Sequence, residues 1–231
     1  MHAFDHSIIV FCNQFAQRWH LFDSIVVFFS NSDLMKGGVM MAGLWWAWFW
    51  PNANLRLNRS YLLSALLGAV IALFLARILA HALPLRNRPI LDPSLHFRPP
   101  YSLPDQSNWT IWSSFPSDHA ALFFALLTGI WLSCRRAGLV LLFYVLIAIC
   151  FPRIYIGIHY PTDILVGAAL GIVSVLFCCW SKIRNLWTKH VLNWIDRWPA
   201  ASYAFLFLIT FEIGTLFWDV RTFLYIFDIS V

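Results

Sequence analysis

A polar stretch in the second half of an otherwise apolar chain combines an arginine, a histidine and an aspartate, at Arg153, His159 and Asp163. An imidazole can attack phosphorus, and an arginine can bind phosphate oxygens in bidentate fashion. A carboxylate about one helical turn beyond the histidine can bond one ring nitrogen and leave the other free to attack. Such residues are costly beside hydrocarbon and persist there mainly for function. The stretch therefore predicts a phosphate-handling site, with His159 as nucleophile and Asp163 as its orienting carboxylate.

Two further polar clusters could complete this site. Ser117 follows Pro116 and precedes a long apolar run, so we expect it to cap a helix whose free N–H groups and positive dipole end favour a bound phosphate. His119, in the first turn of that helix, is placed to protonate a leaving oxygen. Arg88 is expected to bind phosphoryl oxygens together with Arg153. The candidate catalytic residues are His159, His119 and Asp163, and the candidate phosphate-binding residues are Arg88, Arg153 and Ser117.

No metal or other cofactor is expected at this site. Phosphoryl transfer depends chiefly on positioning and charge neutralisation, which fixed arginines and backbone amides can supply. The sequence contains no carboxylate cluster of the kind that holds a metal, and its five cysteines lack metal-type spacing. The net charge of +5 comes without a basic run or interleaved aromatic and basic residues, so a nucleic-acid partner is not expected. The expected partners are a lipid phosphate and the membrane.

The composition predicts a single membrane-embedded, all-α domain over residues 1–231. Hydrophobic residues make up 60% of the chain and charged residues 12%, whereas soluble domains have about a quarter charged. A helix that crosses a membrane needs about 20 mostly apolar residues. Six segments come close, which predicts a polytopic bundle of about six transmembrane helices: Met35 to Trp50, Tyr61 to Ala80, His119 to Ser133, Gly138 to Phe151, Thr162 to Ser181 and Ala200 to Trp218.

The first 30 residues have a different pattern. Aromatic and aliphatic residues from Phe4 to Phe22 recur near helical spacing, with polar residues such as Asp5 and Arg18 between them. This pattern is typical of a helix that lies in the membrane interface. The alternative, a first span in its own right, is weaker because the polar residues interrupt it.

The distribution of Lys and Arg predicts the orientation of the bundle. Cations concentrate in the short loops at one end, which we therefore place in the cytoplasm: Arg56, Arg59, Arg135, Arg136, Lys182, Arg184, Lys189 and Arg197. The other end then holds the loop from His81 to Asp118 and the loop from Arg153 to Pro161. All three polar clusters fall at this outer end, so the topology alone is expected to bring them together.

In this combination and order, the motifs resemble those of the membrane-bound type 2 phosphatidic acid phosphatase superfamily. The family pattern is Lys, six residues and Arg-Pro; then Pro-Ser-Gly-His; then Ser-Arg, five residues, His, three residues and Asp. The chain matches at Arg88-Pro89, at Pro116 to His119 and from Arg153 to Asp163. The resemblance covers about residues 61–181, with an additional C-terminal transmembrane helix at about 200–218.

The resemblance implies a mechanism. His159 would form a phosphohistidine, and Asp163 would hold it in the reactive tautomer. His119 would protonate the leaving group and then activate water. Arg88, Arg153 and the Ser117 region would bind the phosphoryl oxygens.

The chain departs from the family pattern at three positions. Pro152 stands where serine is usual, His81 where lysine is usual, and Asp118 where glycine is usual. Because His81 is shorter than lysine, we expect Arg77 or Arg86 to supply the missing charge. The Asp118 carboxylate is expected to point away from the phosphate and leave its backbone N–H available.

Two charged residues lie within predicted spans, Glu212 in the sixth and Arg77 near the outer end of the second. We expect them to pair and fix helix packing. The alternative is that they bind a substrate headgroup.

The substrate is predicted less sharply than the chemistry. Pro-Ser-Asp-His resembles the branch of bacterial enzymes that dephosphorylate undecaprenyl pyrophosphate, which implies a bacterial inner (plasma) membrane and a periplasmic site. Phosphatidylglycerol phosphate, phosphatidic acid and lipid A phosphates stay open as substrates. A non-catalytic lipid transporter or scaffold is the alternative from another functional class, and the sequence does not predict the oligomeric state.

Overall fold

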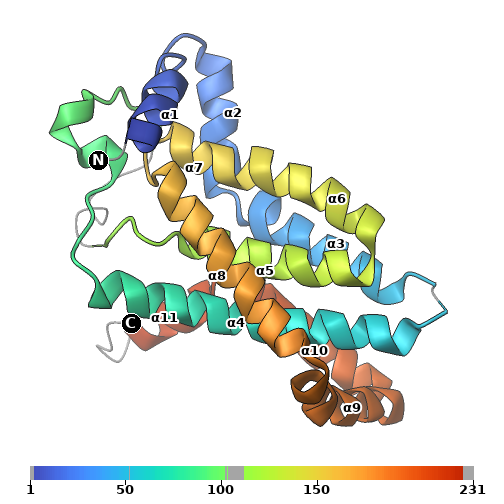
Figure 1. The fold of residues 1–231 in the computed structure, drawn as a ribbon. Helices are drawn as coiled ribbons and strands as arrows, with labels where there is room; N and C mark the ends of the chain where they lie inside the picture. Colours follow the sequence, from blue (N-terminus) through green and yellow to red (C-terminus); the bar gives the residue numbers. More distant parts are fainter. Residues whose placement is uncertain (1–2, 52, 102, 104–111, 226–231) are drawn as a thin grey trace.

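The computed structural model describes residues 3–51, 53–101, 103 and 112–225 of the chain, and these residues form helices and no β-strand (Figure 1). The all-α prediction is therefore confirmed. The helices are α1 (Ala3–Asn13), α2 (His20–Asn31), α3 (Val39–Phe49), α4 (Leu55–Ala82), α5 (Asp118–Ser133), α6 (Arg135–Tyr144), α7 (Phe151–Tyr155), α8 (Pro161–Cys179), α9 (Ser181–Arg197), α10 (Pro199–Gly214) and α11 (Trp218–Tyr225).

The predicted spans correspond to apolar helices that run in the same general direction (Figure 1). Within the described residues, three helical stretches are long and apolar enough to cross a membrane, namely Leu55–Ala82, Arg135–Tyr155 and Pro161–Cys179. The second of these joins α6 to α7 through the π-helical segment η5 (Val145–Cys150). Helices α5 and α10 are apolar but shorter, and α3 is extended at its start by a second π-helical segment, η1 (Leu34–Gly38). The part of the chain described here is thus a helical membrane bundle.

Helices α4, α5 and α8 pack against one another at the centre of the bundle. Small residues on α8 allow this close approach. A Cβ atom at Gly167 would lie 2.3 Å from the carbonyl oxygen of Ser117, and one at Gly171 would lie 2.2 Å from that of Ala121. Because α8 begins directly against the first turns of α5, the two motif-bearing helix starts are fixed beside each other.

The cationic loops gather at one end of the bundle, as predicted. In Figure 1 the α3–α4 connection, the α5–α6 corner and α9 all lie at the right-hand end. Arg56 forms an ion pair of 3.4 Å with Asp196, and Arg184 lies 4.6 Å from the ring centroid of Tyr61, so α9 packs on the start of α4. The three motif segments lie at the opposite end. The membrane side that each end faces stays a prediction.

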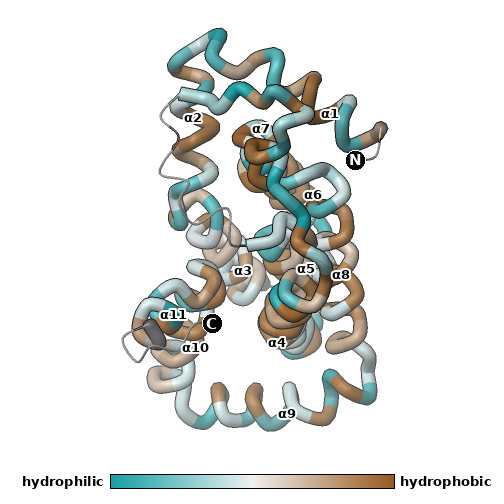
Figure 2. Tube along the Cα trace, turned by 90° about the vertical axis from the view of Figure 1, so that its left-hand side faces the viewer, coloured by the Kyte–Doolittle hydropathy of each residue, from teal (hydrophilic) through white to brown (hydrophobic). Residues whose placement is uncertain are grey.

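The N-terminal region forms two helices, whereas the sequence predicted one. Helices α1 and α2 make a hairpin that runs across the direction of the long helices (Figures 1 and 2). Buried Asp23 holds it together, since its carboxylate accepts hydrogen bonds from Gln17 N, Tyr101 N and Tyr155 Oη. Neither helix has the roughly 20 residues that a span requires, so the alternative of a first span is excluded, while an interfacial location stays a prediction.

The sixth predicted span ends earlier than expected. Helix α10 stops at Gly214, and the backbone turns at Leu216 and Phe217, whose φ angles are +56° and +58°. Such left-handed conformations interrupt a helix. The chain then continues as α11, which lies at the end of the bundle that carries the motifs (Figure 1).

Candidate active site

The three motif clusters converge on one cavity of about 330 Å³ at the non-cationic end of the bundle. Arg88 reaches it from the loop after α4, His119 from the start of α5, Arg153 from α7, and His159 from the loop before α8. The convergence predicted from topology is therefore confirmed. The lining also includes Arg77, Ser113, Asp118 and Arg221.

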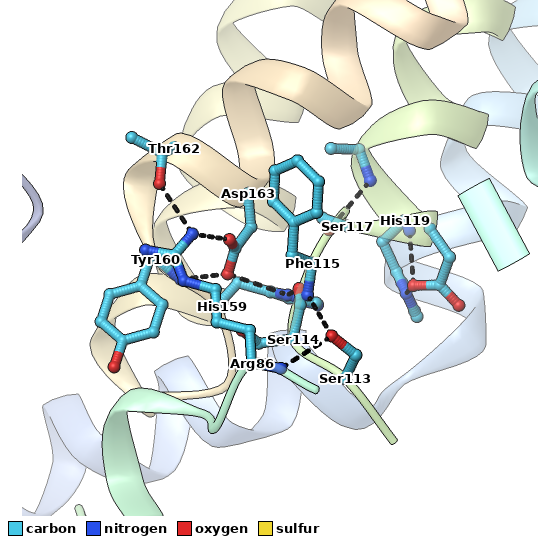
Figure 3. Close-up of polar contacts among 12 residues, drawn as sticks. Arg86, Ser113, Ser114, Phe115, Ser117, His119, His159, Tyr160, Thr162 and Asp163 are labelled. Atoms are coloured by element: carbon cyan, nitrogen blue, oxygen red, sulfur yellow. Dashed lines mark hydrogen bonds and ion pairs between the residues drawn. The ribbon is translucent and has the colours of Figure 1, made fainter. Parts of the chain in front are cut away.

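His159 is buried, and a backbone carbonyl oxygen orients its ring. Gly157 makes the turn out of α7 with a φ of +76°, a conformation that glycine adopts without strain. Nδ1 of His159 lies 2.7 Å from the carbonyl oxygen of Ser114 (Figure 3). A carbonyl oxygen only accepts, so Nδ1 carries the hydrogen. Nε2 is then the unprotonated nitrogen, which is the tautomer that a nucleophile needs.

Asp163 is not the direct partner that the sequence predicted for His159. The closest approach of its carboxylate to His159 Nδ1 is 3.9 Å, too long for a hydrogen bond. Its Oδ2 instead accepts from Tyr160 N at 2.8 Å, which caps the start of α8. The carbonyl of Ser114 takes the orienting position because the segment before α5 passes directly beneath the ring. Through this contact Asp163 fixes the end of the loop that carries His159.

A charge network that the sequence analysis missed surrounds Asp163. Arg86 forms ion pairs with both Asp163 and Asp5, two carboxylates that are fully buried (Figure 3 shows Arg86 and Asp163). Asp5 also accepts hydrogen bonds from the backbone N and the hydroxyl of Thr162, at 3.0 and 2.7 Å. The guanidinium of Arg86 lies 4.1 Å from the ring centroid of Tyr160. The network ties α1 to the start of α8.

These contacts bear on the expectation that Arg77 or Arg86 supplies the charge missing at His81. Arg86 is neutralised by its two carboxylates and is not part of the cavity lining, so it does not replace the missing lysine. His81 is exposed and packs against Trp112 at a ring-centroid distance of 5.1 Å. Arg77 does line the cavity, and one of its nitrogens donates to the carbonyl of Leu216.

Asp118 points toward the site, contrary to the sequence prediction. Its Oδ1 lies 2.8 Å from His119 Nδ1 and also accepts from His119 N at 2.7 Å. A carboxylate on Nδ1 keeps the hydrogen there and stabilises the protonated ring. Asp118 thus orients the His119 ring through Nδ1, which is the contact that Asp163 was expected to make with His159. The sequence feature that could have indicated this contact is the aspartate itself, at a position where the family usually has glycine.

Removal of the Asp118 charge is expected to impair His119 as an acid and base. For Asp118→Asn we expect kcat to fall about 10-fold, since proton transfer by a positioned side chain contributes about 10²–10⁴-fold and His119 itself stays in place. The limb of the pH–kcat profile that reports His119 should move to lower pH, because the imidazolium loses the carboxylate that stabilises it. Steady-state kinetics across pH would measure both effects. An unchanged profile in a folded variant would contradict this role.

Ser117 caps α5 as predicted, and the second and third amides of that helix already have side-chain acceptors. Ser117 Oγ accepts from Ala120 N at 3.3 Å, while His119 N donates to Asp118. Ser117 N donates to the carbonyl oxygen of Asp163 at 3.1 Å. The carboxylate of Asp118 therefore occupies His119 N, whereas the Asp118 backbone N–H, which was expected to stay available, has no acceptor among the described residues. Ser117 links the starts of α5 and α8, immediately behind the cavity.

A partly buried arginine, Arg88, and a buried one, Arg153, supply positive charge to the cavity. Burial lowers the pKa of the Arg88 guanidinium below its usual value, while the negative charges of Asp118 and Asp163 act in the opposite direction. Arg153 is 9% exposed, its Nη2 lies 3.5 Å from the carbonyl oxygen of Ser30, and its Nε has no hydrogen-bond partner among the described residues. A desolvated guanidinium binds an anion more strongly than one in water.

The predicted pair of Arg77 and Glu212 does not form. Within the described ranges, no ion pair of 4 Å or less joins them, and Glu212 Oε2 is buried without a hydrogen-bond partner. The backbone turn after α10 places the carbonyl of Leu216, rather than Glu212, next to Arg77. Among the described residues, no group of three or more His, Cys, Asp or Glu side chains is placed to hold a metal.

Residues 61–187, which include all three motifs, match the PAP2 superfamily. The chain belongs to this superfamily. Over 195 residues it is 30% identical to the Bacitracin transport permease protein BcrC of Bacillus licheniformis, which covers 81% of this chain and 85% of BcrC. Over 173 residues it is 24% identical to YbjG of Escherichia coli (strain K12), which is provisionally named an undecaprenyl-diphosphatase; the match covers 74% of this chain and 80% of YbjG.

The fold of this PAP2 protein is also found in a solved structure. The crystal structure of Aquifex aeolicus LpxE superimposes with a TM-score of 0.50 and 23% sequence identity, over 74% of this chain and 92% of LpxE. Together with the apolar helices, superfamily membership makes the protein a multi-pass membrane enzyme, a lipid phosphatase. The resemblance stated from the motifs is thereby confirmed.

Proposed function

We propose that this PAP2 protein removes the terminal phosphate of a polyprenyl diphosphate, such as undecaprenyl pyrophosphate, without a metal and through a phosphohistidine. The observation that carries the proposal is the pair of histidines, His159 and His119, in one cavity that is also lined by Arg88 and Arg153. Each histidine has an acceptor on Nδ1, the Ser114 carbonyl for His159 and Asp118 for His119. The Nε2 atoms are thus the nitrogens available for chemistry.

In the first half-reaction, Nε2 of His159 attacks the terminal phosphorus. The bond from phosphorus to the bridging oxygen breaks, and that oxygen takes a proton from His119, so a lipid monophosphate leaves. Arg88 and Arg153 neutralise the charge on the equatorial oxygens, which is the main catalytic requirement of phosphoryl transfer. The hydrogen bond from Ser117 N to the carbonyl oxygen of Asp163 fixes the starts of α5 and α8 relative to each other, and with them the two histidines.

In the second half-reaction, water attacks the phosphorus of the phosphohistidine. His119 takes the proton of that water, inorganic phosphate leaves, and His159 returns to its starting state. The same residue thus acts first as acid and then as base. Every proton that moves is accounted for by His119 and water.

The lipid substrate and its location are supported by the relatives and by the distribution of charges. YbjG is named for undecaprenyl diphosphate, and BcrC is the more similar of the two relatives. The cationic loops lie at the end opposite the cavity, which favours a cytoplasmic location for that end and a periplasmic location for the site at a bacterial inner membrane. Phosphatidylglycerol phosphate, phosphatidic acid and lipid A phosphates are the competing substrates.

The test is release of inorganic phosphate by the purified protein in detergent. We expect release from farnesyl and undecaprenyl diphosphate in the presence of a chelator, and inhibition by orthovanadate, which mimics the pentacoordinate phosphorus. A panel with the competing lipid phosphates would rank the substrates by kcat/KM. Full dependence on magnesium would overturn the proposed mechanism.

A transport function is the second candidate because BcrC carries the name of a transport permease. A transporter has no need of a nucleophile, so substitution of His159 would leave transport unaffected. Lipid movement by a His159→Ala variant without any phosphate release from the unsubstituted protein would favour this candidate over the phosphatase.

A further inference from the structure

The catalytic cavity continues into a second lobe that none of the sequence motifs describes. This lobe has a volume of about 360 Å³ and lies between η1, α7 and the start of α11. Asp118, His119, Arg153 and Arg221 line both lobes, so the two spaces meet at the histidine that serves as acid. Arg88 and His159 line only the first lobe. Lys36, Asp33 and Thr215 line only the second.

Two cations from outside the motifs flank the second lobe. Lys36 lies on η1 and is 7% exposed, and its ammonium forms an ion pair of 3.2 Å with Asp33. Arg221 lies on α11, its guanidinium is 5.5 Å from the ring centroid of Trp218, and its Nε is buried without a hydrogen-bond partner in the described part of the chain. A buried donor without an acceptor is costly unless a ligand satisfies it.

The charge of the combined cavity exceeds what one phosphate requires. Among the described residues, five cations line the two lobes, against two carboxylates: Lys36, Arg77, Arg88, Arg153 and Arg221, against Asp33 and Asp118. A phosphate monoester carries about −1.5 to −2 at pH 7, and a second phosphate on the same ester adds negative charge. The excess of positive charge therefore fits a diphosphate better than a monophosphate.

The second lobe also borders the place where a lipid chain could lie. An apolar groove of about 360 Å³ runs between η1, α3 and α10, and Asp33 and Thr215 line both this groove and the second lobe. Met41, Trp45, Phe207 and Phe211 line its length. The phosphate that carries the lipid should occupy the lobe next to this groove, and the terminal phosphate should occupy the lobe with His159.

We propose that Lys36 and Arg221 form a subsite for the lipid-linked phosphate of a diphosphate substrate, and so select diphosphates over monophosphates. This proposal rests on the proposed phosphatase function. In the first half-reaction the breaking bond then lies at the junction of the lobes, next to His119. Lys36 and Arg221 bind the phosphate that departs with the lipid, and stabilise the charge that it gains.

The test compares farnesyl diphosphate with farnesyl monophosphate as substrates. For Lys36→Gln and for Arg221→Gln, we expect the ratio of kcat/KM, diphosphate over monophosphate, to fall about 10-fold, since a hydrogen bond to a charged group corresponds to about that factor or more. Arg221→Lys should recover part of the ratio. Lys182→Gln, an exposed cation at the opposite end, is the matched control and should leave the ratio unchanged.

Calorimetric binding of methylenediphosphonate and of inorganic phosphate provides a readout that does not depend on turnover. The unsubstituted protein should bind the diphosphonate more tightly, and Lys36→Gln and Arg221→Gln should lose that preference. An equal loss of kcat/KM on both substrates, or an unchanged preference for the diphosphonate, would contradict the proposed subsite without affecting the proposed phosphatase function. If no lipid phosphate is hydrolysed while the binding preference holds, the phosphatase function fails and the anion subsite stands.

Discussion

Replacement of His159 by alanine is expected to lower phosphate release from farnesyl diphosphate by about 10³-fold or more, because the variant lacks the nucleophile that the two-step mechanism requires. The fold should persist, since His159 contributes one buried hydrogen bond, from Nδ1 to the Ser114 carbonyl. The rate would be measured as inorganic phosphate released in detergent. His190→Ala, which removes an exposed histidine from α9, is the matched control and should behave as the unsubstituted protein.

A phosphohistidine intermediate makes a second measurement possible. After a brief reaction with substrate labelled in its terminal phosphate, label that is stable to base and labile to acid should be found on the protein. In His119→Ala this label should accumulate, because a lipid monophosphate is a good leaving group while attack by water needs a base. In His159→Ala the label should be absent. Labelling of His159→Ala at the level of the unsubstituted protein would show that another residue is the nucleophile.

Replacement of Arg86 by methionine is expected to destabilise the protein by about 3–5 kcal/mol, the usual effect of leaving a buried charge without its partner. Arg86 is the ion-pair partner of two carboxylates, Asp5 and Asp163, whose side chains are fully buried. The free energy of unfolding would be measured by denaturant titration in mixed micelles. We also expect a loss of activity, since Asp163 fixes the start of α8.

An exposed ion pair is the control for this effect. Arg56 and Asp196 are each 57% exposed, so Arg56→Met should change the free energy of unfolding by about 0–1 kcal/mol. Arg86→Lys should restore only part of the stability, because an ammonium cannot present the planar fork that contacts two carboxylates and the Tyr160 ring. Equal small effects at Arg86 and Arg56 would contradict a structural role for the network.

The main features of the site followed from local sequence patterns. Apolar runs of sufficient length predicted the central spans, and the alternation of spans placed the motifs at one end. The Pro116-Ser117 pair predicted the cap of α5, which forms through Ser117 Oγ. These features depend on residues close together in sequence, so that periodicity, capping and chain length were sufficient to predict them.

The predictions that failed concern contacts between distant segments. Asp163 was expected on the His159 ring because of its spacing, yet the carbonyl of Ser114, 45 residues away, occupies that position. Glu212 was expected to pair with Arg77, yet the turn at Leu216 displaces it. Spacing along a helix shows which groups could meet, but which ones do meet is set by the packing of other segments around them.

The sequence by itself determined which residues gather at the candidate site: two histidines, two arginines and a capped helix start, all at one end of a membrane bundle. The tertiary structure alone determined how each group is held. It places Asp118 on His119, encloses Asp163 with Arg86 and Asp5, and brings Lys36 and Arg221 to a second lobe. The physical reason is that packing decides which distant segments reach the site: Asp5, Lys36 and Arg221 come from α1, η1 and α11, outside the motifs.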